Sequence, residues 1–230
     1  LSVTGDDSVW LQQKEGFRAF SAGEIMVPPV IYLPFEGRGD LHLKGAHRYE
    51  GDIYVFKIAT AFPNNVERSL EPSQGIMLAF DARTAEPIMV LRDEGHLTDL
   101  RTAIAGRNAA EEMMPANALM GVGVLGTGVQ ARLQIALLKN LYPACNKLTV
   151  WGRSRENTVN YAKEVAAMGW DVSIVDSPKQ VADNSNLLIT TTASEVALLD
   201  ANDISMQNTV IIAIGADMPG KVELSPALLQ

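Results

Sequence analysis

The sequence predicts a two-domain α/β protein, with a doubly wound parallel sheet in its C-terminal half and an α+β domain with a mixed sheet in its N-terminal half. Residues from about 23 to 94 read as short strands separated by turns, which is typical of an antiparallel or mixed sheet. From residue 120, nearly continuous apolar strands alternate with helical segments, which indicates a parallel sheet covered on both faces. We expect the domains to span residues 1–117 and 118–230.

The composition is that of a folded globular protein. The 230 residues are 47% hydrophobic and 20% charged, which is too apolar for an intrinsically disordered chain. The 27 acidic and 19 basic side chains give a net charge of −8. This charge argues against binding to nucleic acid or to an anionic membrane, because both require a positive protein surface. No apolar run approaches the roughly 18 residues of a membrane span, and no signal peptide is visible.

The cysteine and histidine content excludes some kinds of disulfide and metal site. A single cysteine, Cys145, excludes an intramolecular disulfide framework and a cysteine-based zinc site. It favours a reducing compartment, so we expect a cytoplasmic protein. The three histidines lack metal-ligand spacing, and we expect no metal site. The chain begins at Leu1 rather than Met and stops at Gln230, and we expect both ends to be cut.

Alternating side chains define the strands of the N-terminal domain, and a change of period marks a helix after them. The segment 53–61 alternates along its whole length and places Lys57 on an otherwise apolar face. Beyond residue 97 the apolar positions follow helical spacing until Pro115. The expected elements here are strands over 40–44, 53–61, 75–79 and 87–91, and a helix over 98–114.

Strands and helices alternate regularly in the C-terminal domain. Its last two strands are almost entirely apolar or β-branched, as expected for strands buried on both faces. The expected strands cover 121–125, 147–151, 171–175, 186–192 and 209–215, and the expected helices cover 130–140, 157–168 and 179–184.

The first of these strands runs into a glycine-rich turn and then a helix. The turn reads Gly126-Thr127-Gly128-Val129-Gln130-Ala131, a GxGxxA pattern. The first glycine allows the tight turn, the second lets the backbone approach a pyrophosphate, and the helix N-terminus presents free N–H groups. A second strand and helix follow, so the pattern predicts a Rossmann-type dinucleotide-binding domain. A glycine-rich turn without a ligand is the alternative.

The end of the second strand indicates which dinucleotide binds. An NAD-specific site usually carries Asp or Glu there to bind the ribose 2′-hydroxyl. This chain has Gly152 instead, followed by Arg153, Ser154 and Arg155, which can contact a 2′-phosphate. We therefore expect NADP(H) to be favoured over NAD(H). The alternative is that these arginines are solvated charges at a helix start.

Four segments carry a resemblance to known proteins. Two are the more specific: residues 97–103 read Leu-Thr-Asp-Leu-Arg-Thr-Ala, and residues 214–224 contain Gly-Ala-Asp-Met-Pro-Gly-Lys-Val-Glu-Leu. The other two are Tyr-Val-Phe-Lys at 54–57 and the glycine turn at 126–132. Together they resemble the ornithine cyclodeaminase and μ-crystallin family over roughly residues 23–230.

The resemblance implies an activity and roles for particular residues. Family members use a nicotinamide cofactor and act at the Cα–N bond of an amino acid. By resemblance, Lys57 and Arg101 would bind the substrate carboxylate, Asp217 would transfer a proton at the reacting nitrogen, and Lys57 and Asp217 would be the catalytic pair. The resemblance also implies a homodimer formed through the N-terminal domain, and a further strand and helix after Gln230.

The residue types agree with these roles. Lys57 lies on an apolar strand face, where a cation needs an anionic partner, although a lysine that reaches solvent from an edge strand is the alternative. Arg101 falls in the first turn of a helix, where a cation opposes the dipole, and this favours a bound anion over a surface ion pair. Asp217 follows an apolar strand at the carboxyl end of a parallel sheet, where ligands bind, or it is a turn residue.

One departure from the family pattern leaves the substrate open. Members commonly carry an arginine after a Pro-Pro pair, as a further carboxylate ligand. In this chain Pro28-Pro29 is followed by Val30. We expect Lys44 or His42, on the neighbouring strand, to substitute for it.

We expect hydride transfer between the cofactor and the α-carbon of a small amino or imino acid, with the nicotinamide near Thr191, Thr192 and Ala193. With NADPH, this step would reduce a cyclic ketimine of the Δ1-pyrroline-2-carboxylate type. With a retained NAD, it would convert ornithine to proline and ammonia. The absence of an acid at Gly152 favours the ketimine reductase. A cofactor-binding protein with little turnover, of the μ-crystallin type, is the alternative of another class.

Overall fold

The computed structural model describes residues 8–218 and 220–229, so Pro219 of the 214–224 motif lies outside the described residues. The chain divides into two compact units. One contains residues 11–101, and the other contains the described residues from 102 onward together with residues 8–10. None of the described helices is both long enough and apolar enough to cross a membrane.

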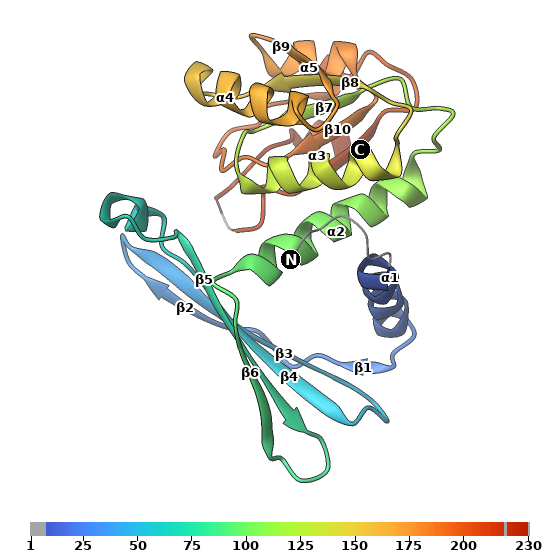
Figure 1. Cartoon of the computed structure of the whole chain (residues 1–230). Helices are drawn as coiled ribbons and strands as arrows, with labels where there is room; N and C mark the ends of the chain where they lie inside the picture. The colour runs from blue at the N-terminus through green and yellow to red at the C-terminus, as the bar shows by residue number, and fades with distance from the viewer. Residues whose placement is uncertain (1–7, 219, 230) are drawn as a thin grey trace. The chain divides into compact units, whose positions relative to one another are not determined.

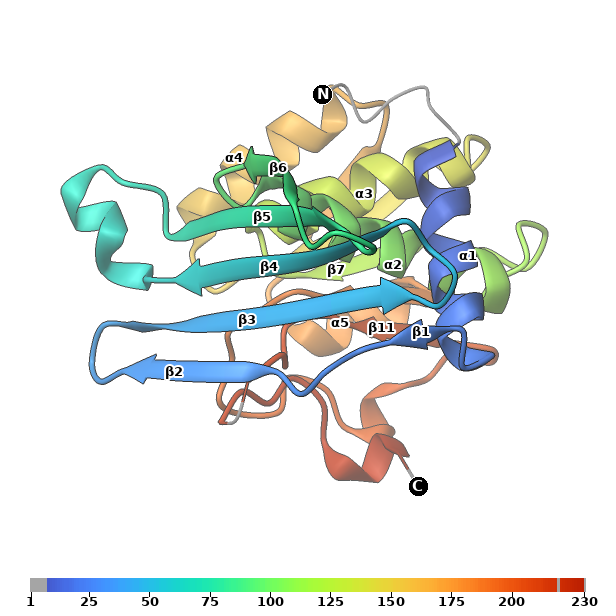
Figure 2. The same cartoon turned by 90° about the horizontal axis from the view of Figure 1, so that it is seen from below.

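The unit of residues 11–101 is built on an antiparallel sheet. Its strand order is β1-β3-β4-β5-β6, and β2 pairs with β3 as well. Figure 2 shows β2, β3, β4 and β5 side by side. The sequence left an antiparallel or a mixed sheet open, and every pairing in this sheet is antiparallel. The strands are β1 (Ile25–Met26), β2 (Ile31–Phe35), β3 (Gly39–Arg48), β4 (Ile53–Ala61), β5 (Ser73–Asp81) and β6 (Pro87–Arg92).

The central strand β4 separates an aromatic face from a face that carries cations. The rings of Tyr54 and Phe80 stack at 5.0 Å between centroids, and Phe56 packs edge-on against Tyr54 at 5.8 Å. Lys57 belongs to the opposite face of β4 and pairs in register with Lys44 of β3. The alternation seen in the sequence therefore sorts the side chains of this strand as expected.

The second unit contains a five-stranded parallel sheet flanked by helices (Figure 1). The strand order β11-β10-β7-β8-β9 is that of a doubly wound fold, with the order reversing between the neighbours β7 and β10. This confirms the predicted fold class. The strands are β7 (Val122–Leu125), β8 (Lys147–Trp151), β9 (Asp171–Ile174), β10 (Leu187–Thr190) and β11 (Val210–Ala213). The helices are α3 (Val129–Leu141), α4 (Arg155–Ala166) and α5 (Pro178–Asn184), and short 3-10 turns lie at Ala201–Asp203 and Pro226–Leu229.

Two apolar cores cover the two faces of this sheet. The larger core joins the helices α3 and α4 to strand residues such as Val124, Val150 and Ile189. The smaller core joins α5 to Leu125 and Leu188, whose side chains point to the other face. Because successive strand residues point to opposite faces, burial on both faces explains why these strands read as continuous apolar runs.

Two helices cross the division between the units, and one of them was not expected. The helix α2 (His96–Met113) corresponds to the helix predicted over 98–114. The units divide inside α2, whereas the sequence places the domain boundary at 117/118, after it. The helix α1 (Ser8–Ser21) was missed, as was the strand β2. β2 contains Pro34, which an edge strand tolerates because it needs fewer ladder hydrogen bonds.

Candidate functional site

The glycine turn after β7 approaches the end of β10 closely. Gly126 has φ +114°, and a Cβ at this position would lie 2.6 Å from Thr191 Oγ1 and 2.9 Å from the Thr191 carbonyl oxygen. Its N–H donates to the Trp151 carbonyl of β8 at 2.9 Å. Only glycine fits this backbone conformation and this spacing. The turn therefore lies where the strand order reverses, which is where doubly wound folds bind dinucleotides.

The second glycine of the turn leaves space for a ligand. Gly128 is the N-cap of α3, and no side chain caps this helix end. A Cβ built on Gly128 would meet no atom within 4 Å. Val129, the first residue of the helix, is exposed. An open backbone beside the positive end of a helix dipole suits a pyrophosphate, so these residues fit the predicted dinucleotide.

An arginine to which the sequence analysis gave no role braces this turn. Arg132 donates through Nη1 to the carbonyl oxygens of Thr127 and Gly128. Its guanidinium is held by Glu164 of α4, at 2.5 Å from Nε and 3.1 Å from Nη2. It also lies 5.4 Å from the centre of the Tyr161 ring. These charge-assisted hydrogen bonds orient the peptide groups of the turn.

The residues after β8 divide into structural and available groups. Ser154 caps α4, since its Oγ accepts the Asn157 N–H at 3.3 Å. Arg155 lies 3.6 Å from Asp176 in an exposed ion pair. Arg153 is exposed and makes no ion pair or hydrogen bond within the described part of the chain. Among these residues Arg153 is therefore the one available to a 2′-phosphate.

Gly152 has a packing role that the sequence did not reveal. A Cβ at this position would lie 2.6 Å from Thr158 Oγ1 and 2.8 Å from Thr127 Cγ2. A carboxylate cannot be placed here without moving both threonines. The absence of an acidic residue is thus already required by packing, and it carries less information about the cofactor than the sequence analysis assigned to it.

The residues expected near the nicotinamide follow β10. Thr191 donates its N–H to the Leu125 carbonyl at 2.9 Å, and Thr192 is bound through its N–H and its hydroxyl to Glu223. Ala193 is exposed. Glu223 was not among the predicted site residues, although it lies in the specific 214–224 motif. Its position between the apolar residues Val222 and Leu224 is the signal that could have indicated a buried acid.

Asp217 lies after β11 and is ion-paired. Its Oδ1 accepts from Lys221 Nζ at 2.7 Å, and its side chain is 64% exposed. Lys221 belongs to the same motif, but the sequence analysis gave it no role. The pair leaves Asp217 an accessible carboxylate beside a fixed cation, at the carboxyl end of the parallel sheet.

In the unit of residues 11–101, Lys57 of the antiparallel sheet lies in the field of two further cations. Lys57 is half-buried, and its Nζ donates to Thr98 Oγ1 at 3.2 Å. Burial, and then the positive charges of Arg101 and Lys44, lower the pKa of Lys57 to about 8, against the opposing effect of Asp93. Three cations that raise one another's electrostatic energy form a site that an anion stabilises.

The structure distinguishes the two substitutes expected for the missing arginine. Lys44 pairs directly with Lys57 across the β3–β4 ladder. His42 lies two residues earlier, with Nδ1 3.3 Å from Asp40 and its ring 4.9 Å from that of Tyr32. Lys44 is therefore the better candidate for the further carboxylate ligand, because its charge acts on Lys57. His42 instead contacts Asp40 and Tyr32.

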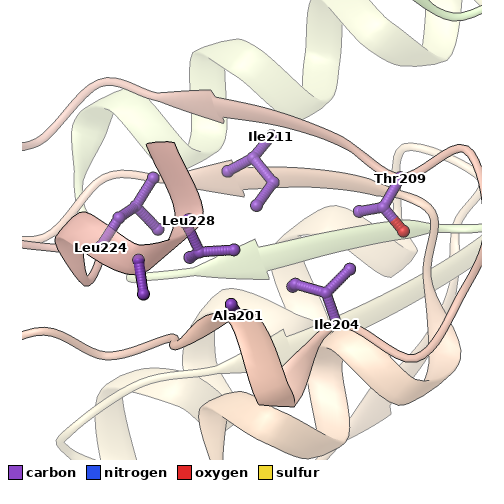
Figure 3. Close-up of a pocket in the computed structure, with 7 residues that line it drawn as sticks. Ala201, Ile204, Thr209, Ile211, Leu224 and Leu228 are labelled. Carbon is purple, nitrogen blue, oxygen red and sulfur yellow. The ribbon is translucent and has the colours of Figure 1, made fainter. Parts of the chain in front are cut away.

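A pocket of about 370 Å³ lies beside the edge strand β11 (Figure 3). Its lining is aliphatic apart from Thr209, and it contains none of the predicted site residues. No cluster of three His, Cys, Asp or Glu side chains suited to a metal ion occurs among the described residues. The pocket is lined by Ala201, Ile204, Thr209, Ile211, Leu224, Ala227 and Leu228.

Comparison with known proteins places these features in a family. The sequence model of the ornithine cyclodeaminase/mu-crystallin family matches residues 7–230. The alanine dehydrogenase of Archaeoglobus fulgidus is 31% identical over an alignment that covers 100% of this chain and 68% of that protein. The chain spans 64–68% of the length of three curated relatives, and half the length of the curated ornithine cyclodeaminases of Brucella that it also matches.

Solved structures share the fold. An archaeal alanine dehydrogenase dimer with bound NAD superposes with a TM-score of 0.88 and is 27% identical, covering 99% of this chain and 68% of that one. The Δ1-pyrroline-2-carboxylate reductase of Thermococcus litoralis, in complex with NADH and L-proline, superposes with a TM-score of 0.87. It is 21% identical and covers 98% of this chain and 69% of that one.

Proposed function

Because this chain belongs to the ornithine cyclodeaminase/mu-crystallin family, we propose that it transfers hydride between a nicotinamide cofactor and the Cα–N bond of a small amino or imino acid. The proposed net reaction is the reduction of a cyclic ketimine of the Δ1-pyrroline-2-carboxylate type to the amino acid. The relatives described above include enzymes that act on amino acids with NAD or NADH.

The observation that carries the proposal is the group of cations around Lys57. Lys44 opposes it across the sheet, Thr98 accepts its hydrogen bond, and the charge of Arg101 lowers its pKa. A substrate carboxylate is a small anion that charge-assisted hydrogen bonds from such a group would bind and orient. A substrate without a carboxylate would not receive these hydrogen bonds.

In the proposed reaction, different residues of the chain bind the cofactor, bind the substrate and transfer the proton. Gly126, Gly128 and the first turn of α3 hold the pyrophosphate, and the bound nicotinamide cofactor supplies or accepts the hydride. Lys57 and Arg101 hold the carboxylate and so fix the orientation of the α-carbon. Asp217 gives or takes the proton on nitrogen. Since Oδ1 of Asp217 is engaged by Lys221, we assign this proton transfer to Oδ2.

NADP(H) is the proposed cofactor, with NAD(H) as the competing one. Arg153 supports this preference, because it is exposed at the end of β8 and makes no ion pair among the described residues. Arg155 adds positive charge, although Asp176 partly compensates it. A 2′-phosphate would be bound by charge-assisted hydrogen bonds, which an uncharged 2′-hydroxyl does not receive to the same extent.

The deciding experiment is a substrate screen of the purified protein that follows nicotinamide absorbance and ammonia together. Oxidation of NADPH by a cyclic ketimine without ammonia release supports the proposal. Ammonia release from ornithine without net cofactor turnover would assign a cyclodeaminase instead. Tight cofactor binding with no turnover on any amino or imino acid would indicate a binding protein of the μ-crystallin type.

We also propose that the protein acts as a homodimer formed through the antiparallel sheet. Its outer strands β2 and β6 expose apolar side chains, including Ile31, Leu33, Met89 and Val90. Exposed apolar strands at sheet edges are typical of surfaces that a partner covers. Sedimentation at micromolar concentration tests this, and a stable monomer would contradict it.

A further inference from the structure

Glu223 is a buried acid whose side chain ties together three separate segments of the chain. It is 1% exposed. It lies six residues after Asp217 in sequence, and its carboxylate reaches the residues that follow β10 and β11. A buried carboxylate is costly unless each oxygen receives hydrogen bonds, so its partners indicate why it is there.

Both carboxylate oxygens are fully engaged. Oε1 accepts from the Thr192 N–H at 2.5 Å and from the Thr192 hydroxyl at 2.8 Å. Oε2 accepts from the Thr190 hydroxyl at 2.7 Å and from the Gly215 N–H at 2.8 Å. Each oxygen thus receives one backbone N–H, from the end of β10 on one side and from the end of β11 on the other. A glutamine cannot reproduce this set, because its amide nitrogen would face an N–H.

Close packing around the carboxylate shows that this arrangement leaves little freedom. A Cβ on Gly215 would lie 2.1 Å from the Thr192 carbonyl oxygen and 2.5 Å from Glu223 Oε1. The backbone next to Glu223 is fixed as well, since its carbonyl accepts the Leu198 N–H at 2.8 Å and the Val222 N–H donates to the Ser194 carbonyl at 2.6 Å. The segment around Glu223 therefore lies along the segment that follows β10.

We propose that Glu223 is a positioning residue that fixes the loop carrying Asp217 relative to Thr191, Thr192 and Ala193. It does so by holding the Gly215 N–H, two residues before Asp217, and the Thr192 N–H with one carboxylate. This inference rests on the proposed function, in which Asp217 transfers the proton and the residues after β10 contact the nicotinamide. Glu223 itself is buried and does not touch the substrate.

A positioning role predicts an effect confined to the nicotinamide half of the site. Glu223→Gln should weaken NADPH binding at least about tenfold and lower kcat by a similar factor, because one backbone N–H loses its acceptor. Binding of 2′-phospho-ADP-ribose, which lacks the nicotinamide, should change less than about twofold. The KM for the imine should stay near the parent value, because the cations around Lys57 belong to the other unit.

A second variant tests the same role if Glu223→Gln does not fold. Thr190→Val removes one hydroxyl donor to Oε2 with little change of shape, and Thr190 is fully buried. We expect the same pattern with a loss of a few-fold. Thr149→Val is the matched control, a buried threonine on β8 away from the carboxylate. It should leave both ligands and kcat unchanged.

The outcomes separate this inference from the proposed function. Equal losses of NADPH and 2′-phospho-ADP-ribose in both variants, or no loss in either, would overturn the positioning role. A parent protein that binds NADPH but reduces no imine would overturn the proposed reaction, while the ratio of the two affinities would still decide the role of Glu223. Hydrogen exchange provides an independent check, because the amides of Thr192 and Gly215 should exchange faster in Glu223→Gln.

Discussion

Lys44 and Lys57 lie directly opposite each other on β3 and β4, so two ammonium groups share one face of the antiparallel sheet. Like charges at opposed positions destabilise a strand pair. Burial and the nearby Arg101 add to this cost and lower the pKa of Lys57 to about 8. A site of this kind is stabilised when an anion binds, which is what a substrate carboxylate would provide.

Replacing Lys57 should therefore weaken substrate binding more than it affects folding. We expect Lys57→Met to raise the KM for the imino acid by roughly 10- to 150-fold, the equivalent of about 1.5–3 kcal/mol for a charge-assisted hydrogen bond. Lys147→Met, on an exposed lysine at the start of β8, is the control and should leave KM unchanged. If a decarboxylated analogue reacts with the parent enzyme as well as the substrate does, Lys57 does not bind a carboxylate.

Substrate affinity should fall as the pH rises through about 8. The pKa of Lys57 lies below its ordinary value of 10.5, mainly because of burial, so the folded protein loses this proton first. Carboxylate binding requires the charged ammonium, and kcat/KM should decline above that pH. Lys44→Met removes a neighbouring charge, so it should raise the pKa of Lys57 and move the decline to higher pH. A profile that is flat between pH 7 and 10 would contradict this assignment.

The same shift predicts how stability depends on pH. Between about pH 8 and 10.5 the unfolded chain keeps the Lys57 proton that the folded chain has lost. The contribution of this group to the free energy of unfolding therefore rises with pH across that window. Denaturant titrations of the parent and of Lys57→Met measure it, and the variant should lack the rise. Because Lys57 is partly exposed, solvent screening makes this rise in the free energy of unfolding smaller.

Asp217→Asn should keep the cofactor and lose the chemistry. The substitution retains the shape of the side chain but removes the ionisable group, and we expect turnover to fall about 10²-fold or more, as is usual for the loss of general acid–base catalysis. Asp171→Asn, at the amino end of β9, makes the same change away from the proposed site. Turnover within a few-fold of the parent at every pH would remove Asp217 from the mechanism.

Arg132→Met should weaken dinucleotide binding although the side chain is not assigned a ligand contact. The variant frees the carbonyls of Thr127 and Gly128, so the turn must be ordered when the ligand binds. We expect a loss of about 1 kcal/mol, or roughly fivefold in affinity, with a smaller loss in Glu164→Gln. Lys179→Met breaks an exposed ion pair on α5 and serves as the control. Unchanged affinity in Arg132→Met would show that the turn is ordered without it.

Arg153→Leu should lower the affinity for NADPH more than that for NADH. One charged contact corresponds to roughly 10- to 150-fold in affinity, and solvent exposure places the effect at the low end. Gly152 should be left unchanged, because a Cβ there would meet Thr158 and Thr127 at under 3 Å. Titrations that follow nicotinamide fluorescence measure both constants. Tighter NADH than NADPH in the parent would show that Arg153 is a solvated charge.

Much of the fold could be predicted because its signals are local. A few consecutive residues are enough to identify the glycine turn, the helix after it and the apolar strands β7, β8, β10 and β11. The spacing of apolar residues and the composition of each segment indicate which of its side chains are buried. The helix α1 and the strand β2 could not be found in this way. β2 is exposed and contains Pro34, so it lacks the pattern of a half-buried strand. In α1 the large side chains of Leu11, Phe17 and Phe20 are exposed, so its apolar residues do not report a buried face.

The sequence by itself determined the class of the fold and the position of the glycine turn, and its resemblance to the family singled out Lys57, Arg101 and Asp217 as candidate residues. The tertiary structure decided which partners these groups have. The opposition of Lys44 to Lys57 depends on strand register, and the reason for Gly152 depends on Thr127 and Thr158. The carboxylate of Glu223 receives its hydrogen bonds from segments up to 33 residues away in the chain, and no local pattern encodes a contact between segments that only the packed sheet brings together.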